Sequence, residues 1–331
     1  MSERLCDRFG RQVDTLRISL TDRCNLRCLY CMPAEGVRLS PRSDLLSFEE
    51  IVRLARCFIQ LGVRKIKLTG GEPLVRKGVV GLVVKGLSGL SGLEDLTLTT
   101  NGVLLTLYAE ELKKANLKRV NISLDTLRRK KFEALTGSDR ITQVLAGIEL
   151  ALSLNLTPVK VNVVLLRGIN DDEIIDFVNL TRRRNLVVRF IEFMPTENRL
   201  PDWTKYFIGR DEILKRIKET GRLVCESEGV VGCGPAEYFQ VSGHQSCFGI
   251  ISPISKSFCQ NCNRIRINAR GELIPCLHHG PTLRLKELLK TFPEGELLSL
   301  IKEAVLRKPS GHSLKLSDAC ASPSLMCQIG G

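Results

Sequence analysis

Long apolar runs are absent from this sequence of 331 residues, in which no 18 consecutive residues are apolar and residues 1–4 start no apolar leader. This absence predicts neither a membrane span nor a secretion signal, and therefore a cytoplasmic chain with no membrane partner. Aromatic residues are also scarce, at 5%, which argues against a stacking surface for single-stranded nucleic acid. Cysteines number 13, an odd count that disfavours a fully paired disulfide framework. In a reducing compartment, clustered thiols more often bind metal.

Positive charge exceeds negative charge, with a formal net charge of +13. Such an excess predicts a polyanionic partner, and both a nucleic acid and a nucleotide polyphosphate satisfy it. The alternative is general use of lysine and arginine on the surface, which net charge alone does not distinguish from a specific site. With 43% hydrophobic residues, the chain can bury one large barrel-like core or two ordinary ones.

Short segments rich in Val, Ile or Thr recur through the first two-thirds of the chain and predict strands at residues 15–20, 65–69, 95–99, 119–124, 159–165 and 187–193. Helical patterns separate them. The clearest helix begins after Ser47, with Glu50 placed for a capping box, and ends near Gly62. Further helices are predicted over 75–87, 107–115, 141–154, 172–184 and 210–219.

Repeated strand–helix–strand units predict parallel strands with right-handed crossovers. Six units are too few for a complete eight-fold barrel, so an α/β fold of either of two kinds fits: a partial (β/α)6 TIM-type barrel or a doubly wound sheet. In both, catalytic groups are expected at the C-terminal ends of the strands. The pattern weakens after Pro195, which predicts a barrel over 1–200 and a C-terminal region over 201–331.

Three thiols, Cys24, Cys28 and Cys31, follow the first predicted strand in the spacing C-x3-C-x2-C. Three ligands suit a metal centre that keeps one position open, whereas structural zinc usually takes four. The bacterial ferredoxin run also supplies four cysteines at a different spacing. An iron–sulfur cluster with one open iron explains both number and spacing. A zinc knuckle completed by a distant Cys or His remains the alternative.

The stretch TGGEP, from Thr69 to Pro73, ends the second predicted strand. Its two glycines let the backbone approach a ligand closely. An ordinary strand-to-helix turn with Pro73 as its first helical residue is the simpler interpretation. That turn explains the glycines and the proline but gives Glu72 no role.

Together, C-x3-C-x2-C and TGGEP resemble the two signatures of the radical S-adenosylmethionine superfamily. The resemblance implies a [4Fe–4S] cluster on the three cysteines, with S-adenosylmethionine on the open iron. One electron then releases a 5′-deoxyadenosyl radical. It also implies cofactor-binding residues: Gly71 and its neighbour Glu72 at the methionine amino group, Tyr30 near the adenine, and the further contacts Ser123 and Met194. For the last two taken alone, packing in the barrel is the favoured role.

A second set of three thiols, Cys259, Cys262 and Cys276, lies in the C-terminal region. Zinc is a stronger alternative here, because His278 and His279 follow closely. Two arginines, Arg264 and Arg266, lie two residues apart and would share one face of a strand. Paired guanidinium groups suit a polyphosphate, although a solvated basic edge is the simpler alternative.

The pattern C-x2-C-x-R-x-R, with its third cysteine fourteen residues on, resembles the GTP 3′,8-cyclases of molybdenum cofactor biosynthesis, which are radical S-adenosylmethionine lyases. The resemblance implies a second [4Fe–4S] cluster that binds the guanine of GTP, and arginines that bind the triphosphate. It further implies that GTP is contacted by Arg17, Lys67, Thr99, Lys160, Arg264 and Arg266.

The C-terminal stretches KPSGHSL and QIGG resemble the end of the same family, and the resemblance implies a catalytic role for Gly330 and Gly331. By composition alone, the two glycines form only a slim flexible tail. The sequence departs from the family pattern in two places. Lys67 replaces the usual arginine and loses its bidentate fork. His278 and His279 add imidazoles next to the second set of thiols.

The resemblance implies conversion of GTP to (8S)-3′,8-cyclo-7,8-dihydroguanosine 5′-triphosphate, the first step of molybdenum cofactor biosynthesis. It also implies an electron donor such as flavodoxin or ferredoxin, a downstream cyclic pyranopterin monophosphate synthase, a homodimer and no nucleic-acid partner. Two other functions compete. One is a peptide-modifying radical S-adenosylmethionine maturase with an auxiliary cluster. The other is a basic zinc-containing nucleic-acid-binding protein.

Overall fold

A curved sheet forms the centre of the molecule. The computed structural model describes residues 4–33, 36–76, 78–183, 185–194, 200, 202–227, 234–312, 314 and 326–329. Twelve of the strands in these ranges form this sheet, in the order β12-β11-β10-β1-β2-β3-β4-β5-β6-β9-β8-β7. The strands β1 to β6 are neighbours in chain order and all parallel.

The six predicted strands are confirmed, with ends shifted by at most one residue. They are β1 (Thr15–Ser19), β2 (Lys65–Thr69), β3 (Asp95–Thr100), β4 (Arg119–Ser123), β5 (Val159–Leu165) and β6 (Leu186–Glu192). A doubly wound sheet would reverse its strand order part-way, and this sheet does not do so between β1 and β6. The partial barrel is therefore the correct alternative.

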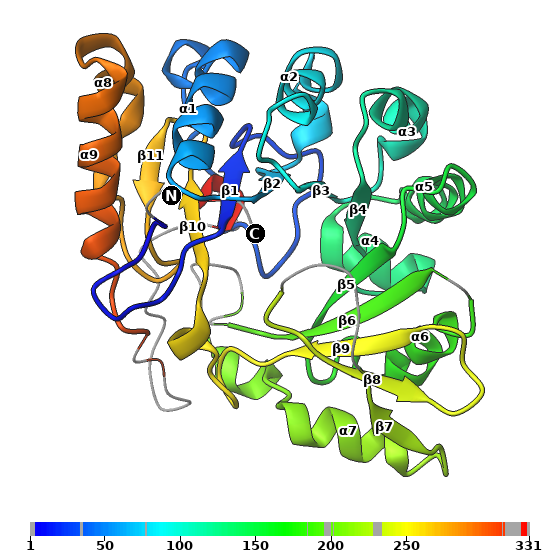
Figure 1. The fold of residues 1–331 in the computed structure, drawn as a ribbon. Coiled ribbons are helices and arrows are strands. Elements are labelled where there is room, and N and C mark those ends of the chain that lie inside the picture. Colours follow the sequence, from blue (N-terminus) through cyan, green and yellow to red (C-terminus); the bar gives the residue numbers. More distant parts are fainter. Residues whose placement is uncertain are drawn as a thin grey trace.

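Helices cover the convex side of the sheet (Figure 1). Their apolar stripes meet the outward residues of the strands, such as Leu16, Ile18, Leu98 and Ile122, all of which are fully buried. The helices are α1 (Phe48–Gln60), α2 (Lys85–Ser88), α3 (Leu105–Lys114), α4 (Arg129–Thr136), α5 (Ile141–Ser153), α6 (Ile174–Leu180), α7 (Arg210–Lys218), α8 (Leu285–Thr291), α9 (Glu294–Leu306) and α10 (Met326–Ile329). None of them is long and apolar enough to cross a membrane, as far as the described residues go.

The C-terminal region extends the same sheet at both edges. After β6 come β7 (Val224–Glu226), β8 (Glu237–Val241), β9 (Cys247–Ile251), β10 (Arg264–Ile267), β11 (Glu272–Ile274) and β12 (Leu283–Arg284). Strand β9 pairs with β6, and β10 pairs with β1, in both cases in parallel. The chain thus crosses from one edge of the barrel to the other between β9 and β10, and both edges belong to one sheet.

The ends of the helices depend on local hydrogen bonds and backbone geometry more than on the periodicity of apolar residues. Ser47 and Glu50 form the predicted capping box, with bonds of 3.1 and 2.7 Å. The helix predicted over 75–87 is wrong in detail: after the left-handed Gly78, a π-helical turn covers Val79–Val84 and only α2 is α-helical. The helix predicted over 172–184 is shorter, because the Thr181 hydroxyl bonds the carbonyl of Val178 at its end. Helix α4 was not predicted.

Candidate functional site

Basic side chains line the concave face of the sheet on neighbouring strands. In the strand register, Arg17 of β1 lies opposite Arg266 of β10 on one side and Lys67 of β2 on the other. Asn121 of β4 likewise lies opposite Lys160 of β5. Alternate residues of a strand share a face, and paired residues on adjacent strands point the same way. The predicted cations of four separate sequence segments therefore meet on one surface.

Lys160 and Arg266 are buried, Arg17 and Lys67 are partly buried, and these cations repel one another. Burial, and then the charges of Arg266, Arg264 and Arg189, lower the pKa of Arg17. Burial and neighbouring arginines lower the pKa of Lys160 to about 7 and that of Arg266 to about 10. Burial, followed by Arg17, also lowers the pKa of Lys67. A polyanion bound here would reverse the repulsion, so the surface is suited to a triphosphate.

Arg189 joins this surface and was not predicted. It lies on β6 opposite Asn162, donates to Asn121 Oδ1 at 3.0 Å, and its buried Nε has no partner among the described residues. Its signal in the sequence is a charged residue in the middle of the apolar run LVVRFIE. A small cavity at this place is lined by Thr15, Lys65, Ile66, Lys67, Asp95, Thr97, Arg119, Asn121, Lys160, Arg189 and Gly234.

The first cysteine loop begins five residues after the carboxyl end of β1. Helix α4 fixes it, since the amides of Arg27 and Leu29 donate to carbonyls at its last turn at 2.7 and 3.0 Å. The backbone amide of Leu26 donates to Cys24 Sγ at 3.4 Å. Burial, and then the charges of Asp125 and Cys24, raise the pKa of the Cys28 thiol. The loop thus brings three partly buried thiols together, and at Cys28 burial and a nearby carboxylate oppose ionisation.

TGGEP packs against this loop. A Cβ on Gly70 would lie 2.6 Å from the carbonyl oxygen of Thr21, and one on Gly71 would lie 2.5 Å from that of Arg23. Both glycines are thus required by the close approach of the two backbones. The Glu72 carboxylate accepts hydrogen bonds from Leu74 N at 3.0 Å, Thr100 Oγ1 at 2.7 Å and Asn101 N at 2.6 Å. Those contacts give Glu72 a role in joining β2 to β3, and burial raises its pKa to about 7.

Tyr30, which the resemblance places near adenine, is fixed by an unpredicted residue. Its hydroxyl donates to Asp125 Oδ2 at 2.5 Å, and Asp125 Oδ1 accepts from the amide of Val164 at 2.8 Å. Burial raises the pKa of Asp125 to about 6. Ser123 ends β4 two residues before Asp125, and Met194 lies two residues beyond β6. All of these residues lie at the carboxyl ends of the strands.

The second set of thiols lies at the opposite end of the sheet. Cys259 and Cys262 precede β10, whose first residue Arg264 pairs with Thr15, the first residue of β1. Cys276 follows β11, which runs antiparallel to β10 and returns the chain to the same end. The expectation that catalytic groups gather at the carboxyl ends is therefore wrong for these three cysteines. The five residues of β1, roughly 17 Å long, and its basic row lie between the two sets.

Cations and imidazoles surround this second set. A hydrogen bond with His312 lowers the pKa of Cys259 to about 6. Burial opposes ionisation of Cys262, but the charges of Arg264 and Lys308 outweigh it and lower the pKa. Burial, together with the charges of Cys262 and Cys259, raises the pKa of Cys276, so the three thiols are electrostatic neighbours. Among the described residues, no three His, Cys, Asp or Glu side chains surround one point at which a single metal ion would sit.

The remaining predicted residues divide into two kinds. Thr99 accepts a hydrogen bond from Asn121 Nδ2 at 3.3 Å, and Lys160 donates to Tyr238 Oη at 3.4 Å, so both lie on the basic surface. Gly330 and Gly331 lie outside the described residues. Arg11 and His312, which support the second set, were not predicted. Their only signal in the sequence is a position near other motif residues.

Comparison with known proteins agrees with this arrangement. Residues 18–181 match the family model of the Radical SAM superfamily, and residues 186–314 match that of Molybdenum Cofactor Synthesis C. The GTP 3′,8-cyclase of Peptoclostridium acidaminophilum is 47% identical over 94% of this chain and 94% of its own length. That of Heliobacterium modesticaldum is 44% identical over 99% of this chain and 100% of its own length.

The chain belongs to the GTP 3′,8-cyclase family. A third member, from Moorella thermoacetica, is 46% identical over 98% of this chain and 99% of its own length. The structure of Streptococcus suis SuiB bound to S-adenosylmethionine covers 88% of this chain, and 68% of its own chain is matched, with a TM-score of 0.59 at 15% identity. At that identity the likeness concerns the fold, and it confirms the predicted radical S-adenosylmethionine barrel.

Proposed function

We propose that this chain converts GTP to (8S)-3′,8-cyclo-7,8-dihydroguanosine 5′-triphosphate, in the first step of molybdenum cofactor biosynthesis. The observation that carries the proposal is the row of buried and partly buried cations between two sets of three cysteines. A radical generated at one end of this row and a nucleotide base held at the other would meet across it. No single motif provides that arrangement, because its parts come from five strands.

Both sets of cysteines fit [4Fe–4S] clusters by their donor chemistry, since three thiols leave one iron open for a ligand. Cys24, Cys28 and Cys31 would hold the cluster that, with S-adenosylmethionine, supplies the 5′-deoxyadenosyl radical. Cys259, Cys262 and Cys276 would hold the second one, on the guanine side. Donors already point at the sulfurs: Asn101 Nδ2 lies 3.8 Å from Cys24 Sγ, and Lys308 Nζ lies 3.3 Å from Cys262 Sγ.

The chain's own residues bind and orient the two substrates. Arg17, Arg264 and Arg266 neutralise the triphosphate, with Lys67, Lys160 and Thr99 beside them. Because these groups are wholly or partly buried and are held on strands before GTP arrives, they act with little reorganisation and at reduced dielectric. Exclusion of water from this space by the bound substrates would protect a reactive primary radical from side reactions.

The S-adenosylmethionine side is built from the carboxyl ends of β2, β4 and β6. Gly71 presents backbone to the methionine group while Glu72 holds its loop, and Tyr30, fixed by Asp125, faces the adenine. Ser123 and Met194 complete the contacts. Gly330 and Gly331 act at the reacting nucleotide.

We also propose a cellular location, an oligomeric state and partners that accompany this activity. The chain works in the cytoplasm, as a homodimer, and takes electrons from a flavodoxin or a ferredoxin. Its product passes to cyclic pyranopterin monophosphate synthase. The barrel over 1–200 carries the radical chemistry and part of the GTP site, and the region 201–331 carries the second cluster, Arg264, Arg266 and the two terminal glycines.

Anaerobic incubation of the reconstituted chain with GTP, S-adenosylmethionine and a reductant tests the proposal. The expected result is loss of GTP matched by formation of the cyclic product and 5′-deoxyadenosine. Formation of 5′-deoxyadenosine with GTP untouched would instead favour a peptide-modifying maturase. Colourless protein that contains zinc, without iron or sulfide, would favour the nucleic-acid-binding alternative.

A further inference from the structure

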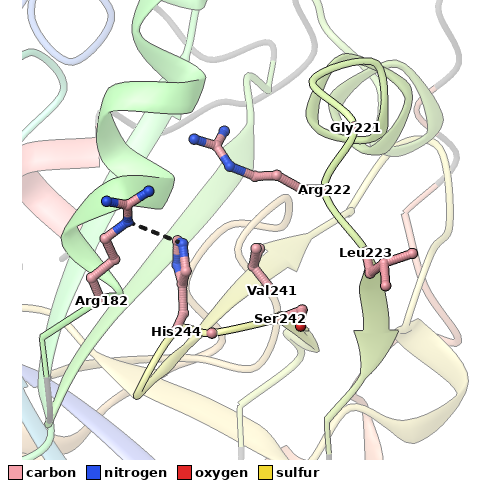
Figure 2. A pocket seen from close by; sticks show the side chains of 8 residues that line it. Arg182, Gly221, Arg222, Leu223, Val241, Ser242 and His244 are labelled. Carbon is pink, nitrogen blue, oxygen red and sulfur yellow. Dashed lines mark hydrogen bonds between the residues drawn. The ribbon is translucent and has the colours of Figure 1, made fainter.

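A second hollow lies on the outside of the sheet, at its amino-terminal end and away from the basic row (Figure 2). It is formed by the turn after α6, the turn before β7 and the turn between β8 and β9. Its lining is Arg182, Gly221, Arg222, Leu223, Val241, Ser242, Gly243 and His244. Among the described residues, this lining contains two arginines and no carboxylate.

A chain of hydrogen bonds fixes the first arginine. Arg182 Nε donates to His244 Nε2 at 3.4 Å, so this ring nitrogen accepts and the ring proton belongs on Nδ1. Nδ1 lies 2.8 Å from Thr181 Oγ1, whose own proton goes to the carbonyl of Val178 at 2.8 Å. His244 is buried, and its pKa is lowered by burial and by the charges of Arg182 and Arg222. A neutral imidazole therefore holds Arg182 without neutralising it.

The second arginine is held from the other side. Arg222 Nη2 donates to Asn179 Oδ1 at 3.0 Å, and Nη1 donates to Thr220 Oγ1 at 3.3 Å. Both partners are neutral, so each guanidinium keeps its full charge and its remaining N–H groups. Figure 2 shows the two guanidinium groups on either side of His244.

We propose that this pocket binds a phosphate group. Two fixed guanidinium forks without a carboxylate match the several oxygens of a phosphate, each of which accepts charge-assisted hydrogen bonds. Gly221 and Gly243 leave open space where a Cβ would stand, so the ligand can approach the backbone. The phosphate could arrive free, or as the end of a polyphosphate.

Hydrogen–deuterium exchange on the reconstituted full chain locates the binding directly, with inorganic phosphate and pyrophosphate as probes. We expect slower amide exchange at 221–223 and 241–244. Protection by both probes indicates a single-phosphate site, and protection by pyrophosphate alone indicates a polyphosphate site; each supports the proposal. No protection by either probe at millimolar concentration overturns it.

Matched variants distinguish binding at this site from a general effect of positive charge. Arg182→Gln with Arg222→Gln should abolish the protection. Arg56→Gln with Arg284→Gln removes the same charge from two exposed arginines elsewhere and should preserve it. Equal protection in both double variants would overturn the proposal.

A separate observation concerns Lys308, which is 1% exposed although it is charged. Its Nζ donates to Cys262 Sγ at 3.3 Å and also to the carbonyl of Arg264. It therefore joins a proposed cluster ligand to the strand that carries both arginines. An N–H group donated to a ligating sulfur stabilises the added electron and raises the reduction potential of an iron–sulfur cluster.

We infer that Lys308 is a positioning residue that keeps Cys262 in register with β10 and raises the potential of the second cluster. The inference rests on the proposed function. Redox titration followed by electron paramagnetic resonance tests it without turnover. Lys308→Met should shift the potential of this cluster to more negative values, and Lys308→Arg should restore most of the shift.

Lys286→Met is the control, because Lys286 Nζ donates to the carbonyls of Ser43 and Leu45 but to no cysteine. An unchanged potential in Lys308→Met, with the cluster present, would overturn the inference and leave the proposed function intact. Wild-type protein that assembles no second cluster would instead overturn the proposed function. Circular dichroism on Lys308→Arg shows whether the fold is kept.

Discussion

The two sets of cysteines offer the same number of thiols in opposite surroundings. Cys28, in the first set, lies near the carboxylate of Asp125, and burial raises its pKa. Cys259 and Cys262, in the second set, lie near His312, Lys308 and Arg264, and their pKa values are lowered. Cys28 would therefore bind a cluster against its own preference for the thiol form. Cys259, with its pKa lowered to about 6, is mostly a thiolate at neutral pH before any metal arrives.

Position in the sheet adds to this difference. The first loop follows β1 at the carboxyl end, beside residues proposed for S-adenosylmethionine, whereas the second precedes β10 at the amino end. The basic row lies between them. We propose that each end of one sheet serves a different substrate, and the experiments below test that assignment.

Replacing one thiol in each set should produce the largest effect. Cys28→Ser should lower reductive cleavage of S-adenosylmethionine by more than about 100-fold, since even residues behind a metal ligand contribute 10- to 100-fold. Cys262→Ser should retain cleavage but lower GTP cyclisation by a similar factor. Chromatographic assay of 5′-deoxyadenosine and of the cyclic product measures both.

Cys225→Ser is the control for this pair, because Cys225 is exposed and outside both sets. It should behave as wild type. Loss of cleavage in Cys262→Ser, with the first cluster fully assembled, would contradict the separation of the two ends.

Alkylation of the cluster-free chain should reveal the difference in ionisation. At pH 7, Cys259 should react with iodoacetamide about 100-fold faster than Cys28, because its larger thiolate fraction outweighs its lower intrinsic nucleophilicity. The rate at Cys259 should rise through its pKa of about 6 and then level off, whereas the rate at Cys28 should still be rising above neutral pH. Peptide mass spectrometry measures each rate, and equal rates at all pH values would refute the contrast.

Arg266→Gln should separate the two substrates. A charged hydrogen bond contributes about 1.5–3 kcal/mol, so GTP affinity should fall by about 10- to 100-fold while S-adenosylmethionine affinity is unchanged. Arg270→Gln removes a nearby exposed arginine that pairs with Glu272, and it should alter neither affinity. Isothermal titration of both ligands decides the matter. Equal losses of affinity for both ligands would mean that Arg266 stabilises the barrel as a whole and does not bind GTP specifically.

The sequence predicted those features for which side-chain chemistry and residue spacing indicate the same arrangement. Six strands followed from their composition, and Arg17, Lys67 and Lys160 meet because strand ends and registers are regular. The amino-end position of the second cysteines could not be read in this way, because it depends on β10 pairing with β1 across some 250 intervening residues. Asp125, Lys308 and Arg11 were missed for a related reason. Each acts through a hydrogen bond to a distant residue, and a single sequence records no such partner.

Replacement of Arg11 should have the smallest effect, confined to the surroundings of the second set of cysteines. Arg11 donates to the carbonyls of Cys259 at 2.8 Å, Ser310 at 2.7 Å and Pro309 at 2.5 Å, and it pairs with Asp7 at 2.6 Å. Arg11→Met should therefore lower the local stability of residues 258–262 and 308–311 by about 1.5–3 kcal/mol. Amide exchange should speed up there and stay unchanged at residues 24–31.

Arg53→Met provides the matched control, since Arg53 donates to the carbonyl of Leu289 at 2.8 Å and touches neither set of cysteines. It should leave both sets of amides unchanged. Faster exchange at residues 24–31 in Arg11→Met would mean that the two ends of the sheet are stabilised together. In that case their different charges would no longer mark two independently supported sites, and the assignment of one substrate to each end would need another basis.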